Sequence, residues 1–364
     1  MVTHAVPCAF FLGDQIIPAV NIGFGLHQPI IFGHLGLHKN CWKPLSAVTI
    51  CQSMTQMPDI SLGHDNANAI SQALGDSFRT YGFAKIIDHG IDPQLTKEAW
   101  RLSKVLFDQP VEAKQRGYDA AIAGQRGYTP FKTEIAKGAD HHDLKEFWHV
   151  GRTLPAGHPL ESTMLPNIWP DSVPGFRDVF EPLYAEFDRV GAKLLSYLAV
   201  YLGLEPDWFD DKINVGNSVL RLLHYPPIAG DTDGCIRAGA HEDINLITLL
   251  LGAEEAGLQI LRPDGSWMDV SPPEGGIAIN VGDMLQRLCN HVLPSTTHRV
   301  VNPSGERTKY SRYSMPFFLH LNSDYPISTL PECISADNPD RNPIPILADD
   351  YLRERLIEIG LLKA

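Results

Sequence analysis

The 364-residue sequence has few of the features that mark disulfide-rich, membrane or nucleic-acid-binding proteins. Its six cysteines are widely spread and include no Cys-x-x-Cys pair, so neither a disulfide framework nor a zinc knuckle is predicted. The formal net charge is −13, which argues against nucleic acid and anionic membranes as partners, because both need a basic surface. The hydrophobic content of 44% and charged content of 20% are typical of a globular protein.

Long apolar segments and a basic start are also missing. No apolar run approaches the roughly 18 residues that a membrane-spanning helix requires. No lysine or arginine precedes Lys39, so the sequence has no basic region of the kind that opens a secretory signal. We therefore expect a cytoplasmic, monomeric protein that binds a small-molecule substrate and needs neither nucleic acid nor a membrane.

Residues 1–56 differ in composition from the rest of the chain. They are rich in glycine, proline and histidine, poor in charge, and show neither helical nor strand periodicity. Two interpretations stay open: an atypical extension of the domain, or sequence that precedes a start at Met54 or Met57. Under both interpretations we expect metal binding and activity to be independent of this segment.

From residue 57 onward, apolar residues recur first with helical and then with strand spacing. Helical spacing predicts helices over residues 67–81, 93–107, 176–202 and 348–362. Residues 126–130 and 143–151 are expected to lie in loops. Short β-rich runs, separated by Gly, Pro and Asn turns, predict strands over 82–91, 218–223, 246–250, 258–261, 277–281, 299–301 and 313–318.

This order of elements predicts a mainly β protein with helical additions (α+β). Many short, evenly spaced strands are typical of a double antiparallel sheet, the jelly roll or double-stranded β-helix. We expect a helical and strand-containing N-terminal region with a bracing helix over 57–212, a jelly-roll catalytic core over 213–325, and a C-terminal tail and helix over 326–364.

The candidate site begins with His241 and Asp243, which precede an apolar, β-rich run. Side chains on a strand alternate between its faces, so residues two apart can point the same way. His298, on another strand-like run, offers a third ligand. Two histidines and one carboxylate form the facial triad of non-heme Fe(II) oxygenases, which leaves the opposite face of the metal open.

A candidate anion-binding pair follows the third ligand in the sequence. Arg312 and Ser314 are two residues apart on a predicted strand and therefore share one of its faces. Arginine binds a carboxylate with two parallel hydrogen bonds, and a serine hydroxyl adds another. The pattern thus predicts an iron site with a carboxylate-binding pair beside it.

Taken together, these stretches resemble the Fe(II)- and 2-oxoglutarate-dependent dioxygenases of the isopenicillin N synthase-like group. The matching stretches are Tyr-Gly-Phe at 81–83, Asp-His-Gly at 88–90, and residues 221–227, 241–250, 257–260, 279–283, 295–300 and 312–318. The resemblance implies a double-stranded β-helix that uses Fe(II), O2 and 2-oxoglutarate as cosubstrate. It also implies iron ligation by His241, Asp243 and His298.

By the same resemblance, Arg312 and Ser314 bind the distal carboxylate of 2-oxoglutarate, and Tyr225 adds a hydrogen bond from its phenol. Leu223 departs from the pattern, because many relatives have an asparagine there that assists the cosubstrate. Isopenicillin N synthase retains the triad and the Arg-x-Ser pair but binds the carboxylate of its own peptide substrate. The pair therefore predicts a carboxylate without identifying it.

Three interpretations stay open at this point. The leading one is an oxygenase that couples decarboxylation of 2-oxoglutarate to hydroxylation, desaturation or cyclisation of a small molecule. The second is an oxidase of the isopenicillin N synthase type, and the third is a non-catalytic jelly-roll binding protein. Tyr128, Phe147 and Trp148 are candidates for the substrate pocket, although loop aromatics more often serve packing. His89 is expected to be structural, and the loop context of His291 favours His298 over it as the third ligand.

Overall fold

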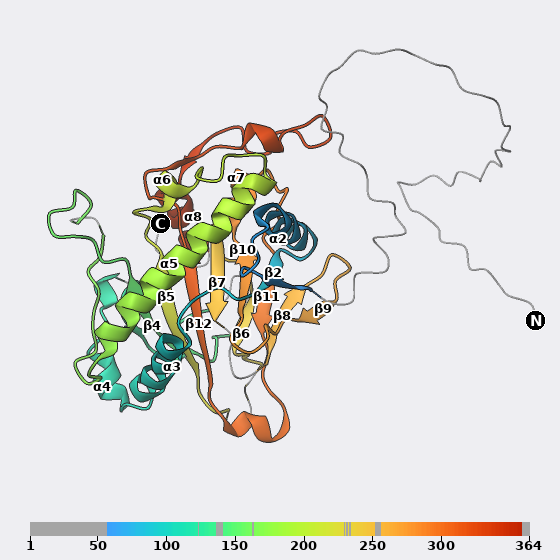
Figure 1. Ribbon diagram of the computed structural model, residues 1–364. Coiled ribbons are helices and arrows are strands. Elements are labelled where there is room, and N and C mark those ends of the chain that lie inside the picture. The colour runs from blue at the N-terminus through green and yellow to red at the C-terminus, as the bar shows by residue number, and fades with distance from the viewer. Residues whose placement is uncertain are drawn as a thin grey trace, which may run out of the picture. The chain divides into compact units, whose positions relative to one another are not determined.

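Two sheets form the framework of the computed structural model, which describes residues 57–122, 124–135, 141–161, 164–228, 230, 232, 234–251 and 256–358 (Figure 1). The larger sheet has the strand order β1-β2-β10-β7-β12-β5-β4-β3, and the smaller one has the order β6-β11-β8-β9. All strand pairs within them are antiparallel except the pair of β1 and β2. The expectations for residues 1–56 and 359–362 lie outside the described residues.

The bounds of the strands are as follows. The larger sheet contains β1 (Asp59–Ser61), β2 (Phe83–Ile87), β3 (Gly127–Thr129), β4 (Glu146–Gly151), β5 (Val219–Tyr225), β7 (Ile247–Leu251), β10 (Ile277–Val281) and β12 (Arg312–Leu319). The smaller sheet contains β6 (Ala238–His241), β8 (Leu258–Leu261), β9 (Trp267–Asp269) and β11 (His298–Val300). A separate pair consists of β13 (Pro326–Ile327) and β14 (Ile346–Leu347).

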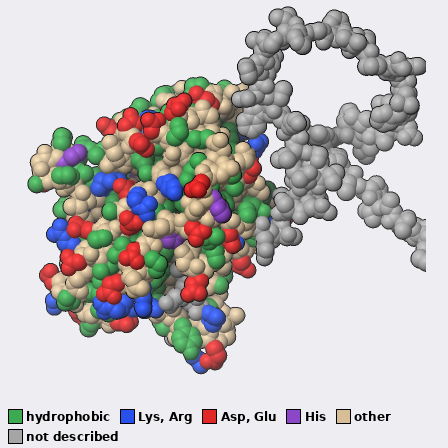
Figure 2. Space-filling model, viewed as in Figure 1, with side chains coloured by type: hydrophobic (Ala, Val, Ile, Leu, Met, Phe, Trp, Pro, Cys, Tyr) green, Lys and Arg blue, Asp and Glu red, His purple; other side chains and the backbone are tan. Residues whose placement is uncertain are grey.

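The helices precede the sheets in the chain, connect their strands, or follow them. They are α2 (Ala67–Tyr81), α3 (Pro93–Phe107), α4 (Val111–Gln115), α5 (Phe176–Tyr201), α6 (Asp210–Ile213), α7 (Asp283–Leu288) and α8 (Ala348–Glu358). None of these described helices is long and apolar enough to cross a membrane. On the face of the molecule in Figure 2, acidic and basic side chains are interspersed.

Local capping explains why the first two of these helices begin and end where the sequence predicts. The side chain of Asn66 accepts a hydrogen bond from the backbone N–H of Ala69, which caps α2, and Asp92 caps α3 in the same way. Gly82 ends α2 in a left-handed conformation with φ of 65°, which costs glycine little because it has no Cβ.

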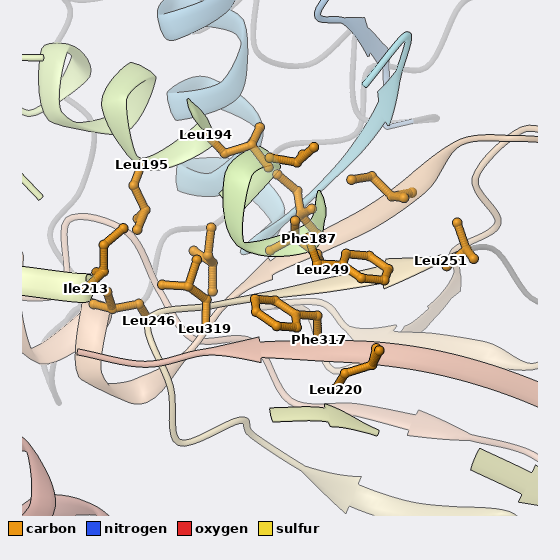
Figure 3. Packing of buried hydrophobic residues seen from close by; sticks show 14 of the residues in the cluster. Phe187, Leu194, Leu195, Ile213, Leu220, Leu246, Leu249, Leu251, Phe317 and Leu319 are labelled. Carbon is orange, nitrogen blue, oxygen red and sulfur yellow. The ribbon is translucent and has the colours of Figure 1, made fainter. Parts of the chain in front are cut away.

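Helix α5 packs across the larger sheet and forms much of the core with it (Figures 1 and 3). The ring of Phe187 on α5 stacks on that of Phe317 on β12, with centroids 5.5 Å apart and an interplanar angle of 7°. Gly191 lets the helix approach closely, because a Cβ there would lie 2.3 Å from Leu319 Cδ1. The predicted bracing role of this helix is thus confirmed.

The expectation that residues 126–130 and 143–151 form loops is wrong. They contain β3 and β4, which extend the larger sheet beyond β5. The polar Glu146 and His149 hid the strand pattern, yet both are buried. Glu146 is tolerated there because it accepts hydrogen bonds from Lys114 Nζ and the Tyr128 hydroxyl and bonds His224 Nδ1 at 2.7 Å.

Candidate metal centre and adjoining cavity

Three side chains from separate places in the sequence converge between the two sheets. His241 ends β6 and His298 begins β11, and the two residues are direct partners in the antiparallel pair. Asp243 follows in the loop after β6, and its Oδ1 lies 3.7 Å from His241 Nε2 and 3.8 Å from His298 Nε2. All three candidate ligand atoms lie within 4.8 Å of one another.

The position of Asp243 corrects one part of the expected arrangement. We expected His241 and Asp243 to share a strand face, but the strand ends at His241 and the turn after it brings Asp243 inward. The backbone N–H of Asp283 donates to the carbonyl of Asp243 at 2.7 Å and so fixes this turn. The side chains converge through a turn rather than through strand alternation.

Two neighbouring strands orient the carboxylate of Asp243. Its Oδ2 accepts hydrogen bonds from Thr248 Oγ1 at 2.6 Å and Asn280 Nδ2 at 2.8 Å, and these two residues are cross-strand partners on β7 and β10. Burial alone raises the pKa of Asp243, but His298, His241 and these hydrogen bonds outweigh it and lower the pKa. The ionised carboxylate therefore presents Oδ1 to the two histidines.

Both histidines are held in the tautomer that a metal requires. His241 Nδ1 lies 2.8 Å from the carbonyl of Gly239, and His298 Nδ1 lies 3.1 Å from the carbonyl of Thr296. A carbonyl only accepts, so each Nδ1 carries the proton and each Nε2 offers its lone pair. Burial, together with the nearby His298, lowers the pKa of His241 to about 4, which keeps this ring neutral.

This donor set suits Fe(II). Two neutral imidazole nitrogens and one carboxylate oxygen on one side of a point are the ligands of mononuclear non-heme iron sites. The hydrogen bonds to both Nδ1 atoms and to Asp243 Oδ2 hold the ligands in place from behind. The structure therefore brings the three predicted residues together, and their donor atoms are of the types that bind Fe(II).

The predicted carboxylate-binding residues lie farther along the inner face of the larger sheet. Arg312 on β12 is the cross-strand partner of Tyr225 on β5, and its guanidinium carbon is 5.1 Å from the centre of the phenol ring. Ser314 is paired with Leu223. Leu223 packs in an apolar cluster with Phe147, Tyr225, Ala238 and Val300, which come from both sheets. The departure at Leu223 thus leaves an apolar surface beside Ser314.

A cavity of about 490 Å³ adjoins the metal centre. Its walls include His241, Asp243, Phe318 and His320, and Leu352 on α8. Phe318 and His320 come from the end of β12 and the residue that follows it. Tyr128 and Trp148, however, are packed in the main core, so of the two roles considered for them the structure shows packing.

A buried set of charged residues on the cavity wall was missed by the sequence analysis. Lys145 Nζ lies 2.8 Å from Glu134 Oε2 and 2.7 Å from Asp143 Oδ2, and Arg221 lies 3.3 Å from Glu134. Burial alone raises the pKa of Glu134, but Arg221 and Lys145 hold it far below its usual range. Had residues 146–151 been interpreted as a strand, side-chain alternation would have placed His149 on the same face as Phe147.

His149 completes this wall as a neutral group. Burial, reinforced by Arg221, lowers the pKa of His149 well below its usual value. Its Nδ1 bonds the carbonyl of Gly124 at 2.8 Å, and its Nε2 accepts a hydrogen bond from Arg221 Nε at 2.6 Å.

The expected structural role of His89 also agrees with the structure, in which its Nε2 bonds the carbonyl of Gly275 at 2.7 Å.

Comparison with known protein families matches two regions of the chain, which together cover most of the described residues. Residues 57–172 match the family described as non-haem dioxygenase in morphine synthesis N-terminal, and residues 216–321 match the 2OG-Fe(II) oxygenase superfamily. A 2-oxoglutarate-Fe(II) type oxidoreductase of Emericella nidulans is 33% identical over 78% of this chain and 82% of its own. These matches favour the first of the three interpretations that the sequence left open.

Solved structures agree in fold. A 2OG-Fe(II) oxygenase family protein from Caulobacter crescentus is 51% identical, with a TM-score of 0.78 over 84% of this chain and 99% of that one. A full-length Neurospora crassa protein, solved in complex with alpha-KG, is 29% identical, with a TM-score of 0.73 over 83% and 95%. The expected double-stranded β-helix with a helical N-terminal region is confirmed.

Proposed function

Because the chain belongs to the 2OG-Fe(II) oxygenase superfamily and acts with Fe(II) and 2-oxoglutarate, we propose that His241, Asp243 and His298 hold the iron. One observation supports this most directly. Two imidazole Nε2 atoms with free lone pairs and one oriented carboxylate oxygen meet at a point beside the cavity.

Arg312, Ser314 and Tyr225 bind the distal carboxylate of 2-oxoglutarate in this proposal. Arg312 and Ser314 share a face of β12, and Tyr225 is the cross-strand partner of Arg312, so their polar groups lie on one side of the sheet. All three are buried, where a charge-assisted hydrogen bond to a carboxylate is strong. The apolar Leu223 beside Ser314 provides no donor to this carboxylate.

The primary substrate occupies the adjoining cavity. When bound, iron and 2-oxoglutarate supply the oxidising chemistry, in which decarboxylation of the cosubstrate is coupled to oxidation of the substrate. The side chains that line the cavity, Phe318 and Leu352 among them, bind and orient the substrate. The position of the substrate then determines which of its carbon atoms is oxidised.

Relatives with this fold act on different small molecules. The Neurospora crassa protein was also solved with alpha-KG and thymine, and a second relative, JOX2, with 2OG, Fe and JA, at 28% and 27% identity to this chain. The choice of substrate therefore depends on the residues of the cavity wall rather than on the metal centre.

We further propose that residues 213–325 form the catalytic core, that residues 57–212 support it, and that the enzyme is a cytoplasmic monomer.

An anaerobic titration of the Fe(II)-loaded protein with 2-oxoglutarate tests this function. We expect the weak charge-transfer absorption of an iron-bound 2-oxo acid to appear and saturate, and to require much more 2-oxoglutarate in Arg312→Ala. Bound iron without this absorption would instead support the oxidase interpretation, and failure to take up iron would support the binding protein. Asp243→Ala should lose tight iron binding, and removal of residues 1–53 should change neither property.

A further inference from the structure

Arg126 is a buried cation on the wall of the cavity. Its side chain is 1% exposed and lines the same cavity as His241 and Asp243. One terminal nitrogen donates to the carbonyl of Gln125 at 2.8 Å and the other to Asn217 Oδ1 at 2.7 Å, whereas Nε has no partner. Both partners are neutral, so these contacts leave the positive charge uncompensated.

Three other buried or largely buried cations have carboxylate partners. Nitrogen-to-oxygen distances of 2.8 Å join Lys114 to Glu146, Lys145 to Glu134, and Arg152 to Asp188. Within the part of the chain that the structure describes, no carboxylate lies within ion-pair distance of Arg126. An isolated buried charge is costly, and it persists in a fold where a ligand or a function compensates for it.

The backbone makes room for this guanidinium. A Cβ on Gly151 of β4 would lie 2.1 Å from the Arg126 guanidinium carbon and 2.1 Å from Nε. Asn217 is also oriented by Arg126, because its Oδ1 accepts the hydrogen bond and its amide nitrogen remains as a further donor. Arg126 and Asn217 thus offer one cation and one amide, and among the residues that the structure describes no acidic side chain bonds either of them.

The metal centre and Arg126 face the same cavity. Its walls include His241 and Asp243 of the metal centre as well as His320, Asn217 and Arg126. A small molecule in this cavity can therefore contact Arg126 and also approach the metal.

We propose that Arg126, assisted by Asn217, binds a carboxylate of the primary substrate, so that the enzyme oxidises a small carboxylic acid. This inference rests on the proposed function, since it concerns the substrate of the same metal site. The carboxylate accepts hydrogen bonds from the guanidinium and from the Asn217 amide. The apolar body of the substrate lies along Val219 and Phe318, with the carbon to be oxidised near the metal.

The test compares acids with their uncharged analogues when the cosubstrate site is full. The protein is loaded with Mn(II) and saturated with 2-oxoglutarate, so that added acids do not occupy the Arg312 site. Aromatic and alicyclic monocarboxylates, each paired with its primary amide, are then titrated by calorimetry. We expect at least one acid to bind about tenfold or more tightly than its amide, as the loss of hydrogen bonds to a charged group predicts.

Two variants distinguish substrate binding from a structural role. Arg126→Gln should abolish the preference for the acid without lowering the melting temperature, because a buried charge without a counter-ion is removed. Asn217→Asp should raise the melting temperature and lower the affinity for the acid about tenfold or more, because the new carboxylate supplies the counter-ion in place of the substrate. Arg189→Gln, which alters an arginine on α5 paired with Glu186, serves as control.

Each result decides the proposal. Equal binding of acids and amides, no binding of any acid, or an unchanged preference in folded Arg126→Gln would overturn it. A lower melting temperature in both variants, with acid binding retained, would mean that Arg126 is structural. Titration of 2-oxoglutarate into each Fe(II)-loaded variant should give the same charge-transfer absorption as the native protein, so that failure of this inference is separable from failure of the proposed function.

Discussion

His298 lies directly opposite His241 in the antiparallel pair of β11 and β6, and the centroids of the two rings are 4.4 Å apart. The edge of the His298 ring also packs against Phe83 on β2, with centroids 5.4 Å apart. Strand pairing and packing therefore set the separation of the two rings before any metal binds. Asp243 is the proposed ligand whose position depends on side-chain hydrogen bonds rather than on strand pairing.

This dependence predicts the effect of removing the partners of Asp243. Thr248→Val and Asn280→Ala each remove one hydrogen bond to Oδ2 and should weaken Fe(II) binding about 10- to 100-fold. Competition with a chromophoric chelator measures this affinity under anaerobic conditions. Thr80→Val, at an exposed position on α2, should leave it unchanged. Native affinity in both site variants would show that the turn alone positions Asp243.

The apolar position beside Ser314 predicts a gain on substitution. Leu223→Asn introduces a donor next to the proposed site of the 2-oxoglutarate carboxylate and should tighten cosubstrate binding up to about tenfold. Leu223→Ala is the matched control, because it removes the same apolar contacts without adding a donor. Titration of the charge-transfer absorption compares the two variants. If both bind 2-oxoglutarate equally, the cosubstrate does not reach this position.

The ion pairs of Glu134 with Lys145 and Arg221 on the cavity wall predict that stability depends on pH. The folded-state pKa of Glu134 lies below its ordinary value of 4.5, because Arg221 and Lys145 outweigh the opposite effect of burial. Its stabilising contribution is therefore fully present above about pH 4.5 and is lost as the pH falls towards the folded-state pKa. Glu134→Gln should destabilise the protein by about 3 kcal/mol at pH 7, because two buried cations lose a partner.

Urea unfolding at pH 7 and pH 3.5 measures this effect. The difference between the native protein and Glu134→Gln should be smaller at the lower pH, since the Glu134 carboxylate of the unfolded chain takes up a proton there while that of the folded protein stays ionised. Glu306→Gln alters an exposed pair with Lys309 and should change stability by less than about 1 kcal/mol. A difference in unfolding free energy that stays constant with pH would contradict the assigned pKa direction.

The contact between α5 and the larger sheet predicts a large packing effect. Phe187→Ala leaves a cavity against Phe317 and should lower the unfolding free energy by about 3–5 kcal/mol. Val200→Ala alters a residue on the same helix that is 36% exposed, and should cost less than about 1 kcal/mol. Thermal or urea unfolding of the two variants gives the comparison. Similar losses would mean that the helix does not depend on this contact.

Local signals were sufficient to predict the helices and most central strands. Apolar spacing and capping residues such as Asn66 and Asp92 act within a few residues of the chain, so the bounds of α2 and α3 follow from sequence alone. The proximity of His241, Asp243 and His298 was predictable because the type and order of the three residues are specific. The way in which Asp243 reaches the site was not, because it depends on a turn.

The charged residues of the cavity wall and strands β3 and β4 were not predictable from the local sequence pattern. Glu146 and Lys145 are polar residues that lie inside the protein because their partners, Lys114 and Glu134, come from distant positions. A single sequence gives no indication of such pairs, so β4 resembles a loop. The isolation of Arg126 is likewise visible only when the neighbours of every buried cation are known.

The order of strands in the larger sheet has a consequence for the autonomy of the two halves of the chain. Strands β1 and β2 flank one side of the strands contributed by residues 219–319, and β3 and β4 flank the other. Residues 54–364 form one compact unit. A fragment of residues 213–325 alone would expose the unpaired edges of β5 and β10 to other chains, which favours aggregation. The strands contributed by residues 59–151 therefore protect both edges of the central strands from pairing with other chains.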